Sequence, residues 1–276
     1  MQNSTTIGFI GAGNMAYALI SGLINNGLNA QNIKLSDTDA ALLSLRANEF
    51  NLKVFTDNTA LASQCDIIVF SVKPQILSVV CKELQAHIDH KPLMISIAAG
   101  VRATDINRWL GGDSAIVRSM PNTPALLGKG ATGMMANDAV NDKQKALAEQ
   151  ILGAVSQCLW VEDEKMIDAV TALSGSGPAY FFLMIESMAK AGVALGLDEK
   201  TAEQLSIQTA LGASMMASNG EDSAHELRAK VTSPNGTTQA AIESFQDQNF
   251  EMIVSHAMRA AFDRARKMGT ELGDDD

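Results

Sequence analysis

Short apolar runs alternate with longer amphipathic stretches over roughly the first 163 residues. Several of the runs are apolar without a break, as strands buried on both faces of a sheet should be. They predict strands at 6–10, 32–36, 66–71, 92–97 and 114–118, with later ones at 130–136 and 158–161. The stretches between them predict helices at 14–26, 39–49, 75–88, 104–110 and 142–156, with Thr104 as the N-cap of the fourth. This alternation is typical of an α/β domain with a parallel-type sheet.

The pattern changes at about residue 164. Strand signals stop there, and long helical patterns follow, interrupted by turn-forming segments at 175–178, 196–197, 219–220 and 233–236. We therefore expect two domains, an α/β domain at 1–163 and an all-α domain at 164–276.

The helical half carries apolar residues on more than one face, for example at Met184, Met188 and 191–195. A helix that is apolar all round must be buried, and about 110 residues provide little interior in which to bury it. We therefore expect the helical half to form a subunit interface in a homodimer or a higher homo-oligomer. The alternative is a monomeric bundle docked on the sheet.

Composition and charge narrow the class of protein. The chain is 46% hydrophobic and 19% charged, as expected of a globular chain, and its net charge of −10 repels phosphate backbones and acidic membranes. We expect no nucleic-acid partner and no membrane partner. No apolar run approaches the roughly 18 residues that a membrane span needs. Residues 1–6 lack the features of a signal peptide, so we expect a cytoplasmic protein.

The cysteines and histidines show no metal-binding or disulfide pattern. Cys65, Cys81 and Cys158 are odd in number, widely spaced and form no C-x-x-C pair, so we expect small core residues in a reducing compartment. His87 and His90 form one H-x-x-H without further ligands at a convincing spacing. We expect no metal.

A glycine-rich turn follows the first predicted strand and opens the first predicted helix. In the pattern G-x-G-x-x-A, Gly11 permits the tight turn, Gly13 leaves room for a pyrophosphate, and Ala16 allows close packing of helix on strand. The helix start supplies N–H groups to the anion. This context predicts a Rossmann-like dinucleotide-binding domain. The alternative is a small-residue turn that serves packing only. The expected contacts are Ile10, Gly11, Ala12, Gly13, Asn14 and Met15.

Asp37 ends the second predicted strand, where a carboxylate normally accepts hydrogen bonds from the adenosine ribose hydroxyls and so favours NAD. Ser36 and Thr38 flank it and provide hydroxyls for a 2′-phosphate if Asp37 turns away. The local chemistry thus leans towards NAD and leaves NADP open.

Three further segments end predicted strands: 71–74, 97–100 and 120–124. Ligands of doubly wound folds lie at the carboxyl ends of strands, so small residues there allow a nicotinamide ribose to approach the backbone. Lys73 is either a cofactor contact or a solvated charge at a helix start.

Two turns rich in Gly, Ser and Pro stand out in the helical half, at 173–180 and 231–238. Each leads into a predicted helix and offers N–H groups beside hydroxyl side chains, which suits a small carboxylate. Ordinary helix capping is the alternative.

With these motifs the chain resembles the pyrroline-5-carboxylate reductases, over essentially its whole length. The motifs are GFIGAGNM at 8–15, VKP at 72–74, AAGV at 98–101, MPNTP at 120–124, LSGSGPAY at 173–180 and SPNGTT at 233–238. The last two together are close to diagnostic. The resemblance implies a Rossmann-like domain followed by an all-α dimerisation domain, with the active site at the dimer interface.

The resemblance also implies the reaction, in which hydride passes from NAD(P)H to C5 of 1-pyrroline-5-carboxylate and gives L-proline. Thr238 would be the catalytic residue, hydrogen-bonded to the ring nitrogen. The implied substrate-binding residues are Glu164, Ser174, Ser233, Gly236, Thr237 and Thr238. The implied cofactor contacts add Ser36, Asp37, Thr38, Asn58, Val72, Lys73, Pro74, Ala98 and Ala99 to the glycine-rich turn.

Some positions depart from the family pattern. Asn235 stands where the family usually has Gly, and Asn tolerates a left-handed backbone better than other non-glycine residues. Residues 223–224 replace a common proline, and Lys230 replaces a small polar residue. Family members generally use NADPH more readily, so the cofactor preference implied by the resemblance is opposite to the one indicated by Asp37. We expect NADPH, with NADH possible.

Two other functions remain as alternatives. A β-hydroxyacid dehydrogenase shares the domain plan, but it usually relies on a catalytic lysine where this chain has residues 174–178. A non-enzymatic nicotinamide-binding module would keep the first turn without needing Thr238.

Overall fold

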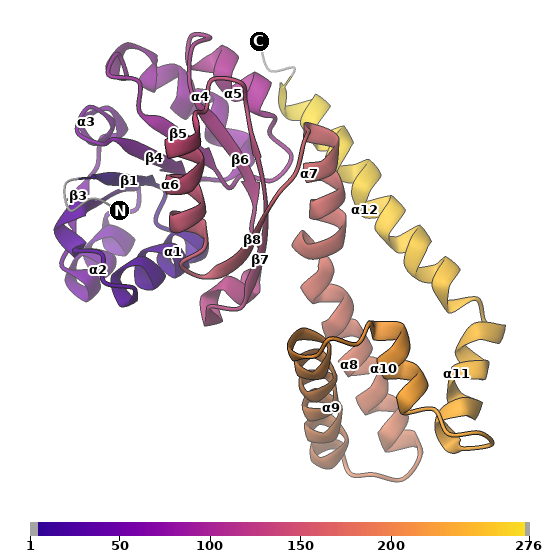
Figure 1. The fold of residues 1–276 in the computed structure, drawn as a ribbon. Coiled ribbons are helices and arrows are strands. Elements are labelled where there is room, and N and C mark those ends of the chain that lie inside the picture. The colour runs from indigo at the N-terminus through magenta and orange to yellow at the C-terminus, as the bar shows by residue number, and fades with distance from the viewer. Residues whose placement is uncertain (1–4, 274–276) are drawn as a thin grey trace. The chain divides into compact units, whose positions relative to one another are not determined.

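The computed structural model of the chain describes residues 5–273. Residue contacts divide it into two compact units. Of the described residues, the first unit holds 5–176 and 261–273, and the second holds Gly177–Ala260. Figure 1 shows the strands and helices of both. Residues 164–176 and 261–273, which the sequence prediction places in the all-α domain, belong to the same contact unit as the sheet.

An eight-stranded sheet forms the centre of the first unit, in the order β3-β2-β1-β4-β5-β6-β7-β8. The chain winds outward from β1 in both directions, which places a topological switch point between β1 and β4. The predicted Rossmann-like arrangement is confirmed. The strands are β1 (Ile7–Ile10), β2 (Ile33–Ser36), β3 (Lys53–Phe55), β4 (Ile67–Phe70), β5 (Leu93–Ser96), β6 (Ile116–Met120), β7 (Gly130–Ala136) and β8 (Ser156–Trp160).

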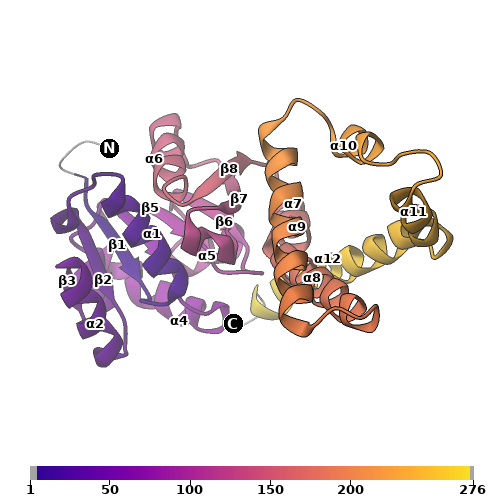
Figure 2. The ribbon, with the colours of Figure 1, turned by 90° about the horizontal axis from the view of Figure 1, so that it is seen from below.

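Helices cover both faces of this sheet, as Figure 2 shows for α1, α4 and α6. Ile7 and Phe9 pack with one group of helices, whereas Ile10, Ile68 and Phe70 pack with the other. Both faces therefore need apolar side chains, which explains the unbroken apolar runs. The helices of one face are α1 (Asn14–Asn25), α2 (Ala40–Phe50) and α6 (Asp142–Leu152), and those of the other are α3 (Asn58–Ala62), α4 (Pro74–Leu84), α5 (Ala103–Trp109) and α7 (Glu164–Val170). The unit also contains the short 3-10 helices η1 (Ala30–Asn32), η2 (Gln85–His87) and η3 (Thr123–Leu127).

Several predicted details of the first unit are wrong. The pattern missed β3 and α3, which are too short to show a period. β7 runs antiparallel to β6, because the η3 turn between them is too short for the crossover that a parallel pair requires. The predicted helix 142–156 ends at Leu152, and β8 already begins at Ser156. Thr104 is not the N-cap of α5; that position belongs to Arg102, whose side chain caps nothing.

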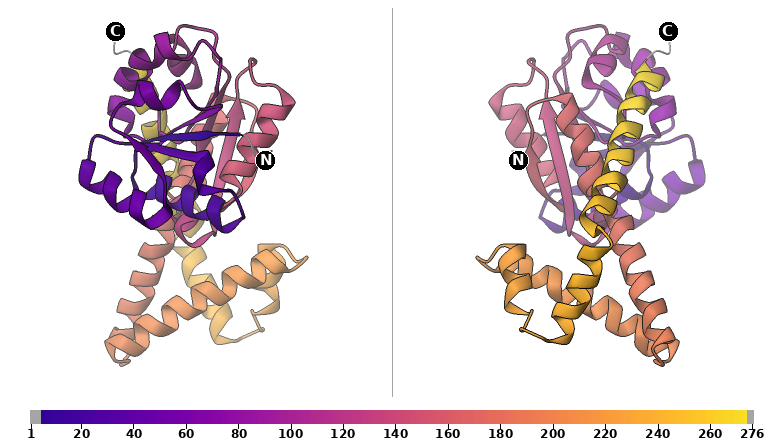
Figure 3. Two further views of the ribbon diagram at one scale, coloured as in Figure 1. Left: turned by 90° about the vertical axis from the view of Figure 1, so that its left-hand side faces the viewer. Right: turned by 90° about the vertical axis from the view of Figure 1, so that its right-hand side faces the viewer.

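The second unit contains α8 (Gly177–Ala194), α9 (Glu199–Asn219), α10 (Ala224–Lys230), α11 (Thr237–Asp247) and the first part of α12 (Phe250–Gly273). α8 and α9 pack closely, since a Cβ built on Gly192 would lie 3.2 Å from that of Ala202. Figure 3 follows α12 in yellow, whose last residues belong to the first unit. No helix in the described part of the chain is long and apolar enough to cross a membrane.

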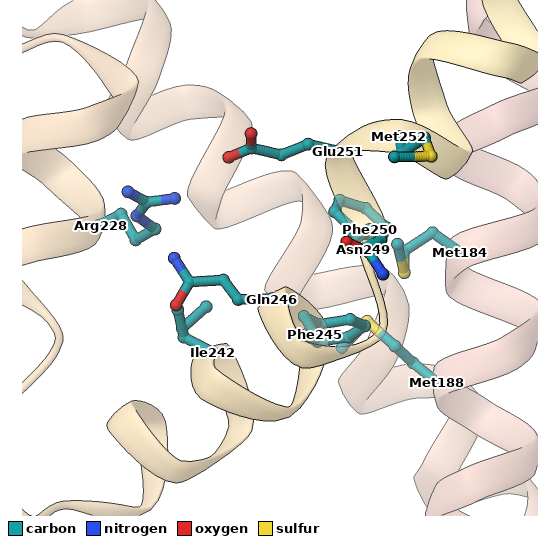
Figure 4. A pocket seen from close by; sticks show the side chains of 10 residues that line it. All are labelled: Met184, Met188, Arg228, Ile242, Phe245, Gln246, Asn249, Phe250, Glu251 and Met252. Carbon is teal, nitrogen blue, oxygen red and sulfur yellow. The ribbon is translucent and has the colours of Figure 1, made fainter.

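The second unit leaves its large apolar side chains in solvent. Phe182 is 65% exposed and Leu195 is 88% exposed, whereas the buried residues of α8–α12 within this unit are the small Gly177, Ala202 and Ser206. An open hollow of about 780 Å³ lies between α8, α11 and α12 (Figure 4). The rings of Phe245 and Phe250 lie in its wall, with their centroids 5.2 Å apart. Apolar surface on this scale needs a covering partner.

Candidate functional site

The glycine-rich turn joins β1 to α1 at the switch point. Gly11 has a φ of +101°, and a Cβ built there would lie 2.6 Å from the Ser71 carbonyl oxygen, so only glycine fits. A Cβ on Gly13 would meet nothing within 4 Å, which leaves open space before the helix. Gly13 is the N-cap of α1, and no side chain caps this helix start. Its first N–H groups are therefore available to an anion, as a pyrophosphate requires.

Asp37 lies directly beside this turn. Its Oδ2 accepts a hydrogen bond from Ala12 N–H at 2.7 Å, and its Oδ1 accepts one from Asp39 N–H at 2.9 Å. Ser36 is fully buried, and its hydroxyl donates to Asn58 Oδ1 at 2.8 Å, whereas Thr38 is exposed. The carboxylate thus braces the glycine-rich turn from the side of the sheet where the adenosine half of a dinucleotide would lie.

The ends of β4 and β5 lie on the other side of the switch point. Lys73 is exposed and is the N-cap of α4, and Pro74 is the first residue of that helix. Ala98 follows β5, and its N–H donates to Ser96 Oγ at 3.3 Å. Val72 and Ala99 are half-buried beside these residues. Because parallel strands end at the same edge of a sheet, all the predicted cofactor residues share one edge of the first unit.

The LSGSGPAY segment is built differently from the expectation. Thr171–Gly175 forms a π-helix, η4, that connects α7 to α8 almost without a break. Ser174 therefore lies inside the π-helix, three residues before α8 begins at Gly177. Asn122 at the end of β6 holds the π-helix by donating from Nδ2 to the Ser174 carbonyl oxygen at 2.9 Å. A Cβ on Gly175 would lie 2.6 Å from Met120 Cε, so the π-helix packs tightly on β6.

The sequence analysis did not predict a charged cluster that joins β6 to α7. Arg118 is 1% exposed on β6, and its guanidinium forms ion pairs with Glu164 and, at 3.1 Å, with Asp168 of α7. Glu164 Oε1 also accepts the N–H of Ala103 at 2.7 Å. The sequence did contain a signal, because Arg118 is a lone charge in a strand that is otherwise suited to full burial, and such a charge requires partners.

The SPNGTT segment leads into α11 of the second unit. Asn235 has a φ of +57°, which confirms that Asn supports the left-handed turn here. Its N–H donates to Gln239 Oε1 at 2.7 Å, and Gly236 N–H donates to the Ser233 carbonyl oxygen at 3.0 Å. Gly236 is the N-cap of α11, with no side-chain cap. The first-turn N–H groups, beginning with Thr237 and the half-buried Thr238, thus remain for a carboxylate.

Comparisons with known proteins cover both parts of the chain. The family described as "Pyrroline-5-carboxylate reductase dimerisation" matches residues 164–268, and the family "NADP oxidoreductase coenzyme F420-dependent" matches residues 6–100. A pyrroline-5-carboxylate reductase of Pseudomonas aeruginosa is 48% identical over 99% of this chain and 100% of its own length.

Two solved structures extend this similarity to the fold. A pyrroline-5-carboxylate reductase of Coxiella burnetii is 42% identical, with a TM-score of 0.92 over 96% of this chain and 98% of that one. The pyrroline carboxylate reductase of Plasmodium falciparum, solved with NADP bound, is 31% identical, with a TM-score of 0.86 over 98% and 100% of the two chains. With end-to-end similarity in sequence and in fold, the chain belongs to the pyrroline-5-carboxylate reductase family.

Proposed function

We infer that the chain reduces 1-pyrroline-5-carboxylate to L-proline with NAD(P)H as the hydride donor, the last step of proline biosynthesis. The observation that carries this function is the end-to-end identity of 48% with a named reductase. Two uncapped helix starts are compatible with it, one at a glycine-rich turn in the first unit and one before Thr238 in the second. The β-hydroxyacid dehydrogenase and the non-enzymatic module receive no support from the relatives.

The residues at the sheet edge fit a dinucleotide. Asp37, Thr38 and Asn58 would lie along the adenosine half, the turn from Ile10 to Met15 would bind the pyrophosphate, and the ends of β4 and β5 would face the nicotinamide half. We propose NADPH as the preferred cofactor and keep NADH as a second one, because Asp37 offers a carboxylate to a ribose. The cofactor supplies the hydride, and the protein orients the two rings and excludes water.

The residues at the start of α11 fit the substrate carboxylate. We propose that the N–H groups of Thr237 and Thr238, with the Ser233 hydroxyl, bind that carboxylate, while Gly236 shapes the turn by donating its own N–H to the Ser233 carbonyl oxygen. The Thr238 hydroxyl would hydrogen-bond the ring nitrogen and keep C5 directed at the nicotinamide. A cyclic imine gains a proton near neutral pH more readily than a carbonyl oxygen does, so the chain needs no dedicated strong acid. We also propose Ser174, on the π-helix η4, as a substrate contact.

The helical half is proposed to bring copies of the chain together. Residues 164–276 would form the substrate-binding and dimerisation part, in agreement with the description of the family that matches residues 164–268. The exposed aromatic and aliphatic side chains of α8 and α9 require such a partner. The chain thus acts as a homo-oligomer.

Oxidation of NADPH and of NADH, each followed at 340 nm with pyrroline-5-carboxylate, tests the proposed activity. Thr238→Ala should lower kcat/KM about 10²-fold, because it removes the hydroxyl that orients the imine. Thr238→Ser, which keeps a hydroxyl, should retain most of the activity. Wild-type turnover in Thr238→Ala would remove Thr238 from the mechanism, and no imine-dependent oxidation by the wild type would reject the function.

A further inference from the structure

The Arg118 cluster joins three chain segments that lie around the proposed site. Arg118 belongs to β6, two residues before Met120, where the strand turns towards the π-helix. Glu164 and Asp168 lie one helical turn apart on α7, and both pair with the same guanidinium. Their side chains are 27% and 13% exposed, so the cluster is shielded from solvent without being closed.

Glu164 differs from Asp168 in having a second partner. While one carboxylate oxygen pairs with Arg118, the other accepts the N–H of Ala103, 61 residues away in the chain. Ala103 is the first residue of α5, and its N-cap, Arg102, provides no side-chain cap. Glu164 therefore supplies from α7 the acceptor that α5 lacks in its own sequence.

The loop that follows β5 and carries Ala98 and Ala99 ends where α5 begins. At its entry, Ala98 N–H is bound to Ser96 Oγ. In its middle, Gly100 has a φ of +77°, and a Cβ there would lie 2.9 Å from Met268 Cβ. At its exit, the carboxylate of Glu164 holds Ala103. A carboxylate held by a buried guanidinium thus fixes the far end of this loop.

We propose that Glu164 is a positioning residue. It holds the end of the Ala98–Val101 loop in the position that the nicotinamide half of the cofactor requires, and Arg118 fixes its carboxylate. This rests on the proposed function for the role of the loop. It differs from direct substrate contact, which the family resemblance implied for Glu164, because both carboxylate oxygens are engaged by donors of the chain itself. A positioning role predicts weaker cofactor binding, whereas direct contact predicts weaker substrate binding.

The test compares Glu164→Ala with Asp168→Ala. Each variant deletes one carboxylate partner of Arg118, but only Glu164→Ala frees Ala103 N–H. NADPH binding, measured by fluorescence titration without substrate, should weaken about tenfold in Glu164→Ala, the effect expected from losing one hydrogen bond to a charged group. It should change less than about twofold in Asp168→Ala, while thermal midpoints fall to a similar extent in both.

Glu164→Gln provides a second variant if Glu164→Ala does not fold. Its single acceptor oxygen can serve Ala103 or Arg118 but not both, so its NADPH affinity should lie between those of wild type and Glu164→Ala. Equal NADPH affinity in the two alanine variants, or a rise confined to the KM for pyrroline-5-carboxylate, would overturn the proposal. Because the titration needs no substrate, a wild type that binds NADPH but does not reduce the imine rejects the proposed function alone.

Discussion

Asp37 shows how one carboxylate can serve the fold and the cofactor together. The sequence indicated a ribose-binding acid from its place after the second strand, but not that the same side chain would bind Ala12 N–H and Asp39 N–H. A carboxylate at this place favours ribose hydroxyls and repels a 2′-phosphate.

Asp37→Ser should therefore raise the ratio of kcat/KM with NADPH to that with NADH by about tenfold, because it removes a negative charge next to the 2′-position. Asp39→Ser is the control: it removes a nearby charge but keeps a side chain able to cap α2. Steady-state kinetics with both cofactors measure the ratio. An equal ratio in wild type and Asp37→Ser would show that the carboxylate does not face the ribose.

The buried thiols should make the protein less stable in alkali. Burial raises the pKa of Cys81 from 9.0 to about 12 and that of Cys65 from 9.0 to about 11. Above pH 9 the unfolded chain loses protons that the folded chain keeps, so the free energy of unfolding falls with rising pH and is unaffected below that range. The slope should be about 1.4 kcal/mol per pH unit for each thiol.

Urea unfolding at pH 8, 9 and 10 measures this slope, and the Cys81→Ala variant should lose part of it. Identical slopes in the variant and the wild type would argue against a contribution from Cys81.

At the scale of elements, two asparagines, the buried Asn122 and the half-buried Asn137, join β6 to β7 at opposite ends. Asn122 binds Ala131 N–H and the Ser174 carbonyl, next to the π-helix. Asn137 binds Ile116 N–H and the Ser114 carbonyl at the other end of the strands. Each side chain accepts from one backbone N–H and donates to one backbone carbonyl, but only Asn122 contacts the π-helix.

Asn122→Ala and Asn137→Ala should each lower the free energy of unfolding by about 1–3 kcal/mol, because each leaves buried backbone groups without a partner. Only Asn122→Ala should also lower kcat/KM, since it releases the segment that carries Ser174. Unfolding curves and kinetics for both variants separate the effects. Unchanged kcat/KM in a folded Asn122→Ala would exclude the π-helix from catalysis.

Long periodic elements could be predicted from the sequence, and short or long-range ones could not. The buried strands, the glycine-rich turn and the start of α11 follow from local patterns that a single segment contains. The π-helix at Thr171–Gly175, by contrast, depends on Asn122 and Met120, which lie some 50 residues earlier. The ion pairs of Arg118 likewise join residues 46 and 50 positions apart. Local spacing carries no information about such partners.

At the scale of the whole molecule, the exposed apolar surface of the second unit is the feature that most affects behaviour in solution. Phe181, Phe182 and Leu183 on α8 are each more than 60% exposed. If this surface is covered by another copy of the chain, folding and association are coupled, and stability depends on protein concentration.

Phe182→Glu should lower the mass measured by light scattering and reduce activity, because it places a charge in the proposed subunit contact. Ala146→Glu, which adds the same charge at an exposed position of α6, should change neither. The thermal midpoint of the wild type, but not that of Phe182→Glu, should rise with protein concentration. A wild type that is an active monomer would contradict the proposed association.

The division of α12 between the two units has a consequence for biosynthesis. Arg102 and Arg108 of the first unit bind Thr270 and Gly273, near the end of that helix. A ribosome therefore completes every helix of the second unit before it delivers the residues that close the sheet domain. Until then the Gly100 loop lacks its neighbour Met268, so a nascent chain should complete this part of the sheet edge only after α12 has been synthesised.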